Sequence, residues 1–196
     1  MASNLQRSYE DRIRSLLNSK NAKDVAKGQK LQATYQKLQD AKEVFHVVRE
    51  GGSGTGELTY RGSPGNLYVE MKGDGSGYGY MPDVQKLGHE FEHGEQFLNG
   101  DLGFQLVNGK WQGYRDDLVD ESAAFMAGFD AQSVGPDQGA FLQDLQRAAN
   151  AGGQQAVIDR LSRSGPYAGR ATTQVPITTR PDGTLPPTVY AVPRTN

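Results

Sequence analysis

The sequence contains no cysteine and only three histidines among its 196 residues. Without cysteine there is no disulfide framework, no thiolate-bound metal and no thiol nucleophile. No apolar run approaches the roughly 18 residues of a transmembrane helix, and the first residues lack the apolar stretch of a secretory signal. The formal net charge of −2 gives no general reason to expect a nucleic-acid partner. The length is that of one domain, or of one domain with an appendage.

Charge and proline are unevenly distributed along this chain. Residues 1–42 carry nine Lys/Arg and four Asp/Glu, a net charge of +5, so the remainder carries −7. Apolar residues recur there at helical spacing, which predicts a basic helical pair broken near 18–21 and packed on the core. Residues 43–163 are the expected core domain. Residues 164–196 hold six of the nine prolines and are expected to form an extended tail, lying on the body or disordered.

Patterns within residues 43–163 predict alternating short strands and helices. The expected strands cover 43–48, 57–60, 66–71 and the two arms of a hairpin at 104–112, whose Asn-Gly turn is typical of type I′. The expected helices cover 83–99, 117–132, 138–149 and 153–163. We therefore expect an α+β fold with a small mixed sheet, an active-site helix and a second ligand helix.

The clearest motif is His89-Glu90-Phe91-Glu92-His93, which fits the pattern H-E-x-x-H. On a helix, residues four apart lie on one face, so both imidazoles can reach one zinc ion. The glutamate between them projects beside the metal, where it can take a proton from zinc-bound water. The spacing predicts zinc ligands at His89 and His93 and a general base at Glu90.

A catalytic zinc needs a third protein ligand, and the composition makes an acid the expected choice. The remaining histidine, His46, lies on a predicted strand and is interpreted as a core or surface residue. Glu121 stands within the apolar stripe of the helix at 117–132, where a carboxylate is costly to bury unless it is paired or binds metal. We predict Glu121 as the ligand; the alternative is a buried carboxylate paired with an arginine such as Arg115. The other downstream acids considered are Glu95, Asp101, Asp116, Asp117, Asp120 and Asp130.

The HEFEH motif, followed by Asp120-Glu121-Ser122-Ala123-Ala124-Phe125, resembles the gluzincin pattern of zinc metallopeptidases. The layout over residues 43–132 is also similar to compact metallopeptidase domains of bacterial effectors and polymorphic toxins. The resemblance implies one zinc ion per chain held by His89, His93 and Glu121, with Glu90 as general base. Glu92 departs from the pattern, because an apolar residue is usual at that position.

Several further residues are candidates for supporting roles. Tyr78, Tyr80, Tyr114 and Arg115 flank the two ligand helices and are candidate stabilisers of the transition state. Trp111 and Tyr80 are candidate substrate contacts. The Gly-rich stretch 73–80 is a candidate flap. The strand Leu67–Met71 is a candidate edge for pairing with an extended substrate; the alternative is an interior strand of the sheet.

Together these features predict a zinc-dependent endopeptidase of toxin or effector type. The expected partners are a protein substrate and a delivery apparatus or cognate inhibitor, with no nucleic acid and no transmembrane segment. We expect a soluble monomer that is secreted or delivered into a target cell without a classical signal peptide. One alternative is a non-catalytic binding module with a structural zinc site. Another is a metallopeptidase-like domain held inactive by a partner or by its own tail.

Overall fold

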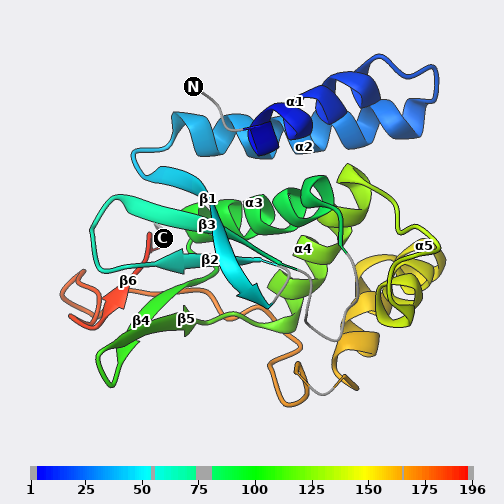
Figure 1. The fold of residues 1–196 in the computed structure, drawn as a ribbon. Helices are drawn as coiled ribbons and strands as arrows, with labels where there is room; N and C mark the ends of the chain where they lie inside the picture. The colour runs from blue at the N-terminus through cyan, green and yellow to red at the C-terminus, as the bar shows by residue number, and fades with distance from the viewer. Residues whose placement is uncertain (1–3, 54–55, 74–80, 165, 194–196) are drawn as a thin grey trace.

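The computed structural model describes residues 4–53, 56–73, 81–164 and 166–193. Within these ranges the fold consists of five helices and two three-stranded sheets (Figure 1). The helices are α1 (Asn4–Leu17), α2 (Ala22–Asp40), α3 (Asp83–Asn99), α4 (Leu118–Ala131) and α5 (Ala140–Leu161). The strands are β1 (Val44–Ser53), β2 (Glu57–Tyr60), β3 (Asn66–Gly73), β4 (Gly103–Val107), β5 (Lys110–Tyr114) and β6 (Val189–Tyr190). The predicted α+β class, mixed sheet and N-terminal helical pair are confirmed. None of these helices combines the length and apolar character needed to cross a membrane.

The helices α1 and α2 form a pair that packs on α3 (Figure 1). The pair breaks at 18–21, where Asn21 caps α2 by accepting a hydrogen bond from the backbone N–H of Lys23 at 3.0 Å. Tyr9 of α1 is fully buried, and its ring meets Phe91 of α3 edge-on at 5.1 Å between centroids. Aromatic packing thus fixes the basic pair on one side of the helix that carries the H-E-x-x-H motif.

The first sheet has the strand order β1-β3-β2. β1 pairs with β3 in parallel, and β2 pairs with β3 antiparallel. The turn between β2 and β3 contains Gly62 and Gly65 at φ values of +83° and +80°, which glycine adopts without a steric penalty. Leu67–Met71 is therefore the central strand, and the prediction that its edge receives substrate is wrong. Alternating apolar residues mark a half-buried strand but do not distinguish the centre of a sheet from its edge.

The second sheet consists of the predicted hairpin β4–β5 and a strand from the C-terminal tail. Asn108 and Gly109 have φ values of 50° and 75°, as a type I′ turn requires. The tail strand β6 pairs with β4 through Phe104 and Tyr190. Tyr190 stacks on Tyr60 of β2 with ring centroids 4.0 Å apart, so aromatic contacts join the two sheets.

The helices α3 and α4 approach each other closely because glycines line their contact. A Cβ atom added to Gly88 would lie 2.8 Å from Cβ of Ala131, and one added to Gly128 would lie 3.0 Å from the backbone oxygen of Gln85. No larger residue fits either position without displacing the partner helix. This close crossing brings the motif on α3 within reach of the side chains of α4.

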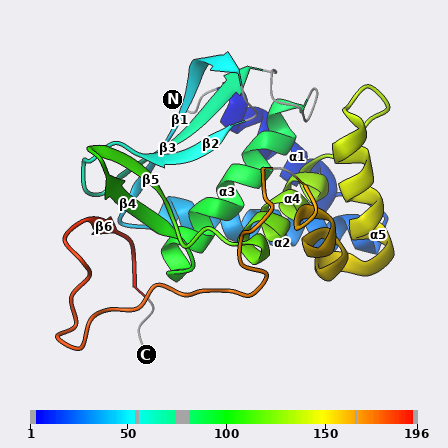
Figure 2. The ribbon, with the colours of Figure 1, turned by 90° about the horizontal axis from the view of Figure 1, so that it is seen from below.

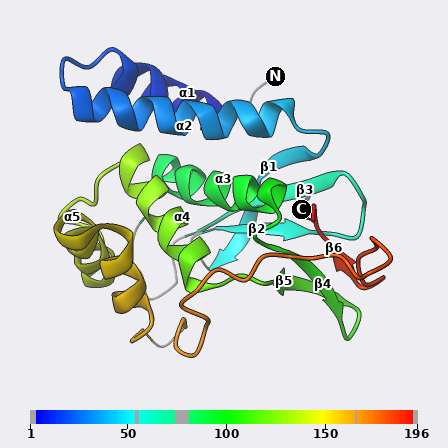
Figure 3. The same ribbon diagram turned by 180° about the vertical axis from the view of Figure 1, so that it is seen from behind.

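Part of the tail beyond α5 runs along the body of the protein (Figure 3), whereas the stretch before β6 is largely exposed. Its backbone accepts a hydrogen bond from Leu118 N–H at Ala171 O, at 2.8 Å, and Ile177 N–H donates to Gly100 O, also at 2.8 Å. The tail thus passes the start of α4 and the end of α3 on its way to β6 (Figure 2). Before the tail, Gly152 and Gly153 interrupt α5, where the sequence predicted a break between two helices.

Candidate metal centre

The H-E-x-x-H motif lies on α3, and its two histidines converge on one glutamate of α4. His89 Nε2 and His93 Nε2 are 3.2 Å apart. Glu121 Oε2 lies 3.8 Å from His89 Nε2 and 3.9 Å from His93 Nε2. The side chains of all three residues are nearly buried, with exposed fractions of 9–12%. The structure therefore brings together the three predicted ligands, from two helices that are separate in the sequence.

The spacing of these atoms suits a tetrahedral metal ion. Ligands about 2.0–2.2 Å from a zinc ion in a tetrahedron lie roughly 3.3–3.5 Å from one another. The observed separations of 3.2, 3.8 and 3.9 Å bracket that value. Glu121 Oε2 is buried but accepts no hydrogen bond from the described residues, which is costly for a carboxylate oxygen. A cation at the centre of the three atoms would satisfy it.

Gln96 determines which nitrogen of His93 faces the centre. Its amide nitrogen donates to the backbone oxygen of Asp120 at 2.9 Å, so its oxygen must face His93 Nδ1, 2.8 Å away. An oxygen can only accept, so Nδ1 of His93 carries a proton. In the neutral imidazole, which is the form that binds metal, the lone pair is therefore on Nε2 and faces the centre. His89 differs, because its buried Nδ1 has no hydrogen-bond partner among the described residues.

The electrostatics of the centre favour a positive charge. In His93, burial opposes protonation, but the carboxylates of Glu121, Glu90 and Asp116 outweigh it and raise the pKa to about 9. In His89, burial and the neighbouring His93 lower the pKa well below its usual value. Starting from two neutral imidazoles, the pair thus binds one additional proton strongly, on His93, and resists a second, on His89. The surrounding carboxylates that retain this proton would also attract a metal cation.

Glu90 of α3 is buried beside the centre, and its carboxylate lies next to the start of strand β2. Burial, reinforced by the charges of Glu121 and Glu57, raises the pKa of Glu90 to about 7, although His93 and the backbone N–H of Leu58 act in the opposite direction. A Cβ atom at Gly56 would lie 3.0 Å from Glu90 Oε1, so glycine there leaves room for the carboxylate. A carboxyl with this pKa both accepts and releases a proton near neutral pH.

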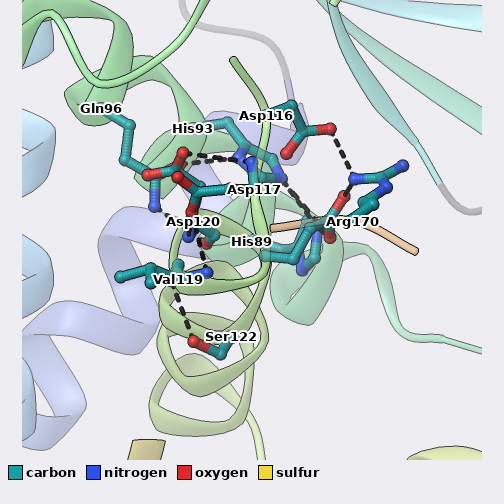
Figure 4. A network of polar contacts seen from close by, with 10 residues as sticks. His89, His93, Gln96, Asp116, Asp117, Val119, Asp120, Ser122 and Arg170 are labelled. Carbon is teal, nitrogen blue, oxygen red and sulfur yellow. Dashed lines mark hydrogen bonds and ion pairs between the residues drawn. The ribbon is translucent and has the colours of Figure 1, made fainter. Parts of the chain in front are cut away.

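Arg170, from the C-terminal tail, binds the other oxygen of the third ligand. Its Nη1 donates to Glu121 Oε1 at 2.9 Å and to Asp116 Oδ2 at 2.7 Å; the pair with Asp116 is drawn in Figure 4. The expected alternative for Glu121, a buried carboxylate paired with an arginine, therefore holds for one of its oxygens, but the partner is Arg170 and not Arg115. Arg170 lies 49 residues beyond Glu121, and no local spacing connects the two. The signal that remained was the buried acid itself, which requires a cation from somewhere in the chain.

An open cleft of about 790 Å³ runs along the centre. The edge strand β2 contributes Glu57 and Leu58 to its wall, together with Gly56, which directly precedes the strand. One part of the wall is apolar, formed by Met81, Phe125 and Tyr167, and another is polar, formed by Gln112, Arg115, Asp116 and Arg170. Tyr167 is buried and meets Phe125 edge-on at 6.1 Å between ring centroids. Like Arg170, it was not identified from the sequence, because its segment has no helical or strand period.

The predicted supporting residues fall in different places. Arg115 is exposed on the cleft wall and has a positive φ of 65°, an uncommon conformation for a residue with a side chain. Its neighbour Tyr114 is half-buried beneath the Arg115 guanidinium, with 5.2 Å from Arg115 Cζ to the ring centroid. Trp111 packs edge-on against Tyr60 at 4.6 Å between ring centroids and does not line this cleft. The predicted roles of Tyr78 and Tyr80, and the flap at 73–80 apart from its first residue, lie outside the described residues.

The remaining predicted candidates have other partners. Glu95 pairs with Lys37 of α2 at 3.2 Å, and Asp130 pairs with Lys27 at 3.5 Å. His46 is half-buried on β1, where its Nε2 lies 2.9 Å from Asn66 Oδ1. Among the described residues, only His89, His93 and Glu121 form a group of three or more potential ligands.

Comparisons with models of known protein families, with curated proteins and with solved structures find no match to this chain. The functional assignment therefore depends on the geometry of the centre.

Proposed function

We propose that this protein is a zinc-dependent endopeptidase whose metal is held by His89, His93 and Glu121. The observation that carries the proposal is the buried Oε2 of Glu121, which accepts no hydrogen bond from the described residues and faces two imidazole nitrogens. Beside it lies a buried glutamate with a pKa near 7, and the whole group opens onto a cleft. These are the parts that a metal-assisted hydrolysis requires.

The ligand set favours zinc and a catalytic over a structural role. Two imidazole nitrogens and one carboxylate oxygen are ligands that zinc accepts, and a structural zinc site is normally closed by four protein ligands. Here the described residues provide three, on the wall of an open cleft. This arrangement leaves a fourth position for water, which counts against the alternative of a binding module with a structural zinc.

Glu90 is the general base of the proposed reaction. Zinc bound at the centre would supply a polarised carbonyl and a bound water of lowered pKa. With its own pKa near 7, the Glu90 carboxylate would take up a proton and release it to the leaving amine. Arg115 stands on the cleft wall as a donor for the oxyanion, and Tyr114 and Tyr80 remain candidates for that role.

The proposed substrate is an extended segment of a protein. The edge strand β2 borders the cleft through Glu57 and Leu58, and an extended peptide can add to such an edge by backbone hydrogen bonds. Leu58 also contacts Glu90 through its backbone N–H. A peptide aligned on β2 would thus pass beside the general base, with an apolar side chain directed toward Met81, Phe125 and Tyr167.

We further propose a toxin or effector role, in which the target protein belongs to another cell. Support comes from the resemblance of HEFEH and the following Asp120–Phe125 segment to compact effector and toxin metallopeptidases. A delivery apparatus and a cognate inhibitor are the partners that this role requires.

The decisive experiment compares wild-type protein with Glu90→Gln. The substitution keeps the shape of the side chain but removes the base, so zinc content near one ion per chain and the thermal midpoint should be unchanged. Cleavage should fall by at least about 100-fold, the lower end of what general-base catalysis contributes. The readout is terminal-peptide profiling of candidate proteomes incubated with each protein.

Two outcomes contradict the proposal in different ways. New termini produced equally by wild type and Glu90→Gln would rule out the mechanism. Stoichiometric zinc with no new termini in any proteome would support the structural-zinc alternative.

A further inference from the structure

The two oxygens of Glu121 have separate partners. Oε1 accepts a hydrogen bond from Arg170 Nη1 at 2.9 Å, whereas Oε2 faces His89 and His93 and accepts no hydrogen bond from any part of the chain that the structure describes. The exposed fraction of the Glu121 side chain is 9%, and that of Arg170 is 33%. The carboxylate is therefore held from its outer oxygen, and its inner oxygen is presented to the metal position.

Asp116 holds Arg170 from the other side. Its Oδ2 accepts from the same Nη1 at 2.7 Å, so one cation lies between two carboxylates (Figure 4). Asp116 directly precedes the N-cap of α4, and Glu121 lies in the first turn of that helix. The guanidinium thus links the loop before α4 to the ligand on α4 by charge-assisted hydrogen bonds, which are stronger than neutral ones.

The tail segment around Arg170 is anchored on both sides. Before it, Tyr167 is buried against Phe125, and the Arg170 guanidinium lies over the Tyr167 ring, with Cζ 5.0 Å from the centroid. After it, Ala171 O accepts from Leu118 N–H and Val175 N–H donates to Asp117 Oδ2, each at 2.8 Å. The segment is therefore fixed to the same first turn of α4 that carries the ligand.

From this geometry we infer that Arg170 is a positioning residue that makes Glu121 a one-oxygen ligand and so keeps the fourth metal position open. The inference rests on the proposed metal site. With Oε1 engaged by Arg170, Glu121 offers one oxygen to the metal. Without Arg170, the carboxylate is free to turn and offer both oxygens, filling the position that water and substrate need.

The experiment uses the full chain loaded with Co²⁺, whose visible absorption reports coordination number, and with Zn²⁺ in competition with a chelator. In Arg170→Gln, Zn²⁺ affinity should fall by about 10–100-fold, as is typical when an outer partner of a metal ligand is removed. The Co²⁺ bands should weaken and shift, because a carboxylate that binds through both oxygens raises the coordination number. Arg170→Lys should recover part of the affinity, because it keeps the charge without the planar fork.

Arg180→Gln is the matched control, because Arg180 lies on the same tail and is exposed. It should leave affinity and spectrum unchanged. If Arg170→Gln does not fold, Asp116→Asn decides: it keeps Glu121 but removes the second anchor, so affinity should fall several-fold with a spectral change in the same direction. Glu121→Ala gives the reference for complete loss of the ligand.

The results separate this inference from the proposed metal site. Wild-type affinity and an unchanged spectrum in Arg170→Gln, or in Asp116→Asn if that variant is needed, overturn the positioning role while the metal site stands. A lower thermal midpoint with the wild-type spectrum also overturns it, since Arg170 then only stabilises the fold. Failure of wild-type protein to bind either metal stoichiometrically removes the site itself.

Discussion

At the scale of single residues, Gln96 has two hydrogen bonds that permit only one orientation of its amide. Its nitrogen donates to Asp120 O, so its oxygen accepts from His93 Nδ1. When His93 is neutral, its one ring proton is therefore held on Nδ1, away from Glu121. A contact three residues from the ligand on the same helix thus decides whether a metal finds a lone pair or an N–H at Nε2.

We predict that Gln96→Leu weakens zinc binding by about tenfold, the lower end of the usual effect of such outer contacts. Leucine has a similar size but cannot accept the Nδ1 proton, so the imidazole can place it on Nε2 instead. Chelator competition measures the affinity, and ¹⁵N chemical shifts of the histidine ring report the tautomer. Gln155→Leu, at an exposed position of α5, should change neither. An unaltered tautomer with unaltered affinity would show that Gln96 serves packing only.

Glu92 illustrates why one residue of the motif departs from the usual pattern. It lies on the face of α3 that meets α2, and its carboxylate is 3.9 Å from Lys30 Nζ, with 13% of the side chain exposed. An apolar residue would be expected if an apolar layer covered this face. Here a basic helix covers it, so an acid is the complementary choice, even though burial raises the pKa of Glu92.

At the scale of elements, the start of α4 carries both the ligand and the attachment of the tail. Asp117 caps the helix, with Oδ1 accepting from Val119 N–H at 2.9 Å and Asp120 N–H at 3.2 Å. Its other oxygen accepts from Val175 N–H of the tail at 2.8 Å. One buried carboxylate therefore caps the N-terminus of α4 and anchors the segment that contains Arg170.

We predict that Asp117→Ala lowers both stability and metal affinity, whereas Asn21→Ala lowers stability alone. Each substitution removes a helix N-cap, which costs about 1 kcal/mol and up to about 2 kcal/mol. Asn21 caps α2 without any contact to the metal centre, so it isolates the cost of the cap. Denaturant unfolding measures stability, and zinc competition measures affinity. Equal affinity in the two variants would show that the tail attachment does not reach Glu121.

Local patterns in the sequence predicted the helices and the motif but not the contacts between distant segments. The helix at 83–99 was predicted with the observed bounds, because Pro82, the apolar period and Gly100 are all local signals. Glu121 was identified because an acid within an apolar stripe conflicts with its surroundings. Both predictions depend only on neighbours within a few turns.

The errors and omissions concern pairings that no local period encodes. The strand Leu67–Met71 has the alternation of any half-buried strand. Its central place arises because β1 pairs with it in parallel on one side and β2, which lies between the two in the sequence, pairs with it on the other. The strand β6 has only two residues, Val189 and Tyr190, which is too short for a period. Arg170 lies at the end of a series of turns after α5, where its backbone N–H donates to Tyr167 O, and the position of its side chain is decided by tertiary contacts.

At the scale of the whole molecule, opposite charges are sorted onto segments that then pack together. Residues 1–42 have a net charge of +5 and the remainder −7, and ion pairs such as Lys37–Glu95 join α2 to α3. The proposed metal centre concentrates negative charge further, because Glu90, Glu121 and Asp116 lie near His93. Proton uptake at this centre therefore links the pH to the stability of the fold.

We predict that the metal-free protein loses stability as the pH rises from about 6.5 to about 9. The carboxylates raise the pKa of His93 from 6.5 to about 9, so in this window the folded state binds a proton that the unfolded state has released. Stability therefore falls with rising pH. Glu90 and Asp120, whose pKa values are raised to about 7 mainly by burial, act in the same direction at the lower end of this pH window. The thermal midpoint should fall by several degrees across the window.

Zinc should reverse this dependence, because it takes the place of the His93 proton. Metal binding requires the neutral imidazole, so apparent affinity rises as the pH approaches 9 and the stabilisation by zinc grows with it. The midpoints of zinc-loaded and metal-free protein, measured in parallel at each pH, should thus diverge from pH 6.5 upward. His93→Gln removes the titrating group and should flatten most of the slope of the metal-free protein. Two results would contradict this: a thermal midpoint of the metal-free protein that rises with pH, or a stabilisation by zinc that is largest at pH 6.5. Either would mean that His93 is not protonated in the folded state. The excess of carboxylate charge inferred for the centre would then be wrong.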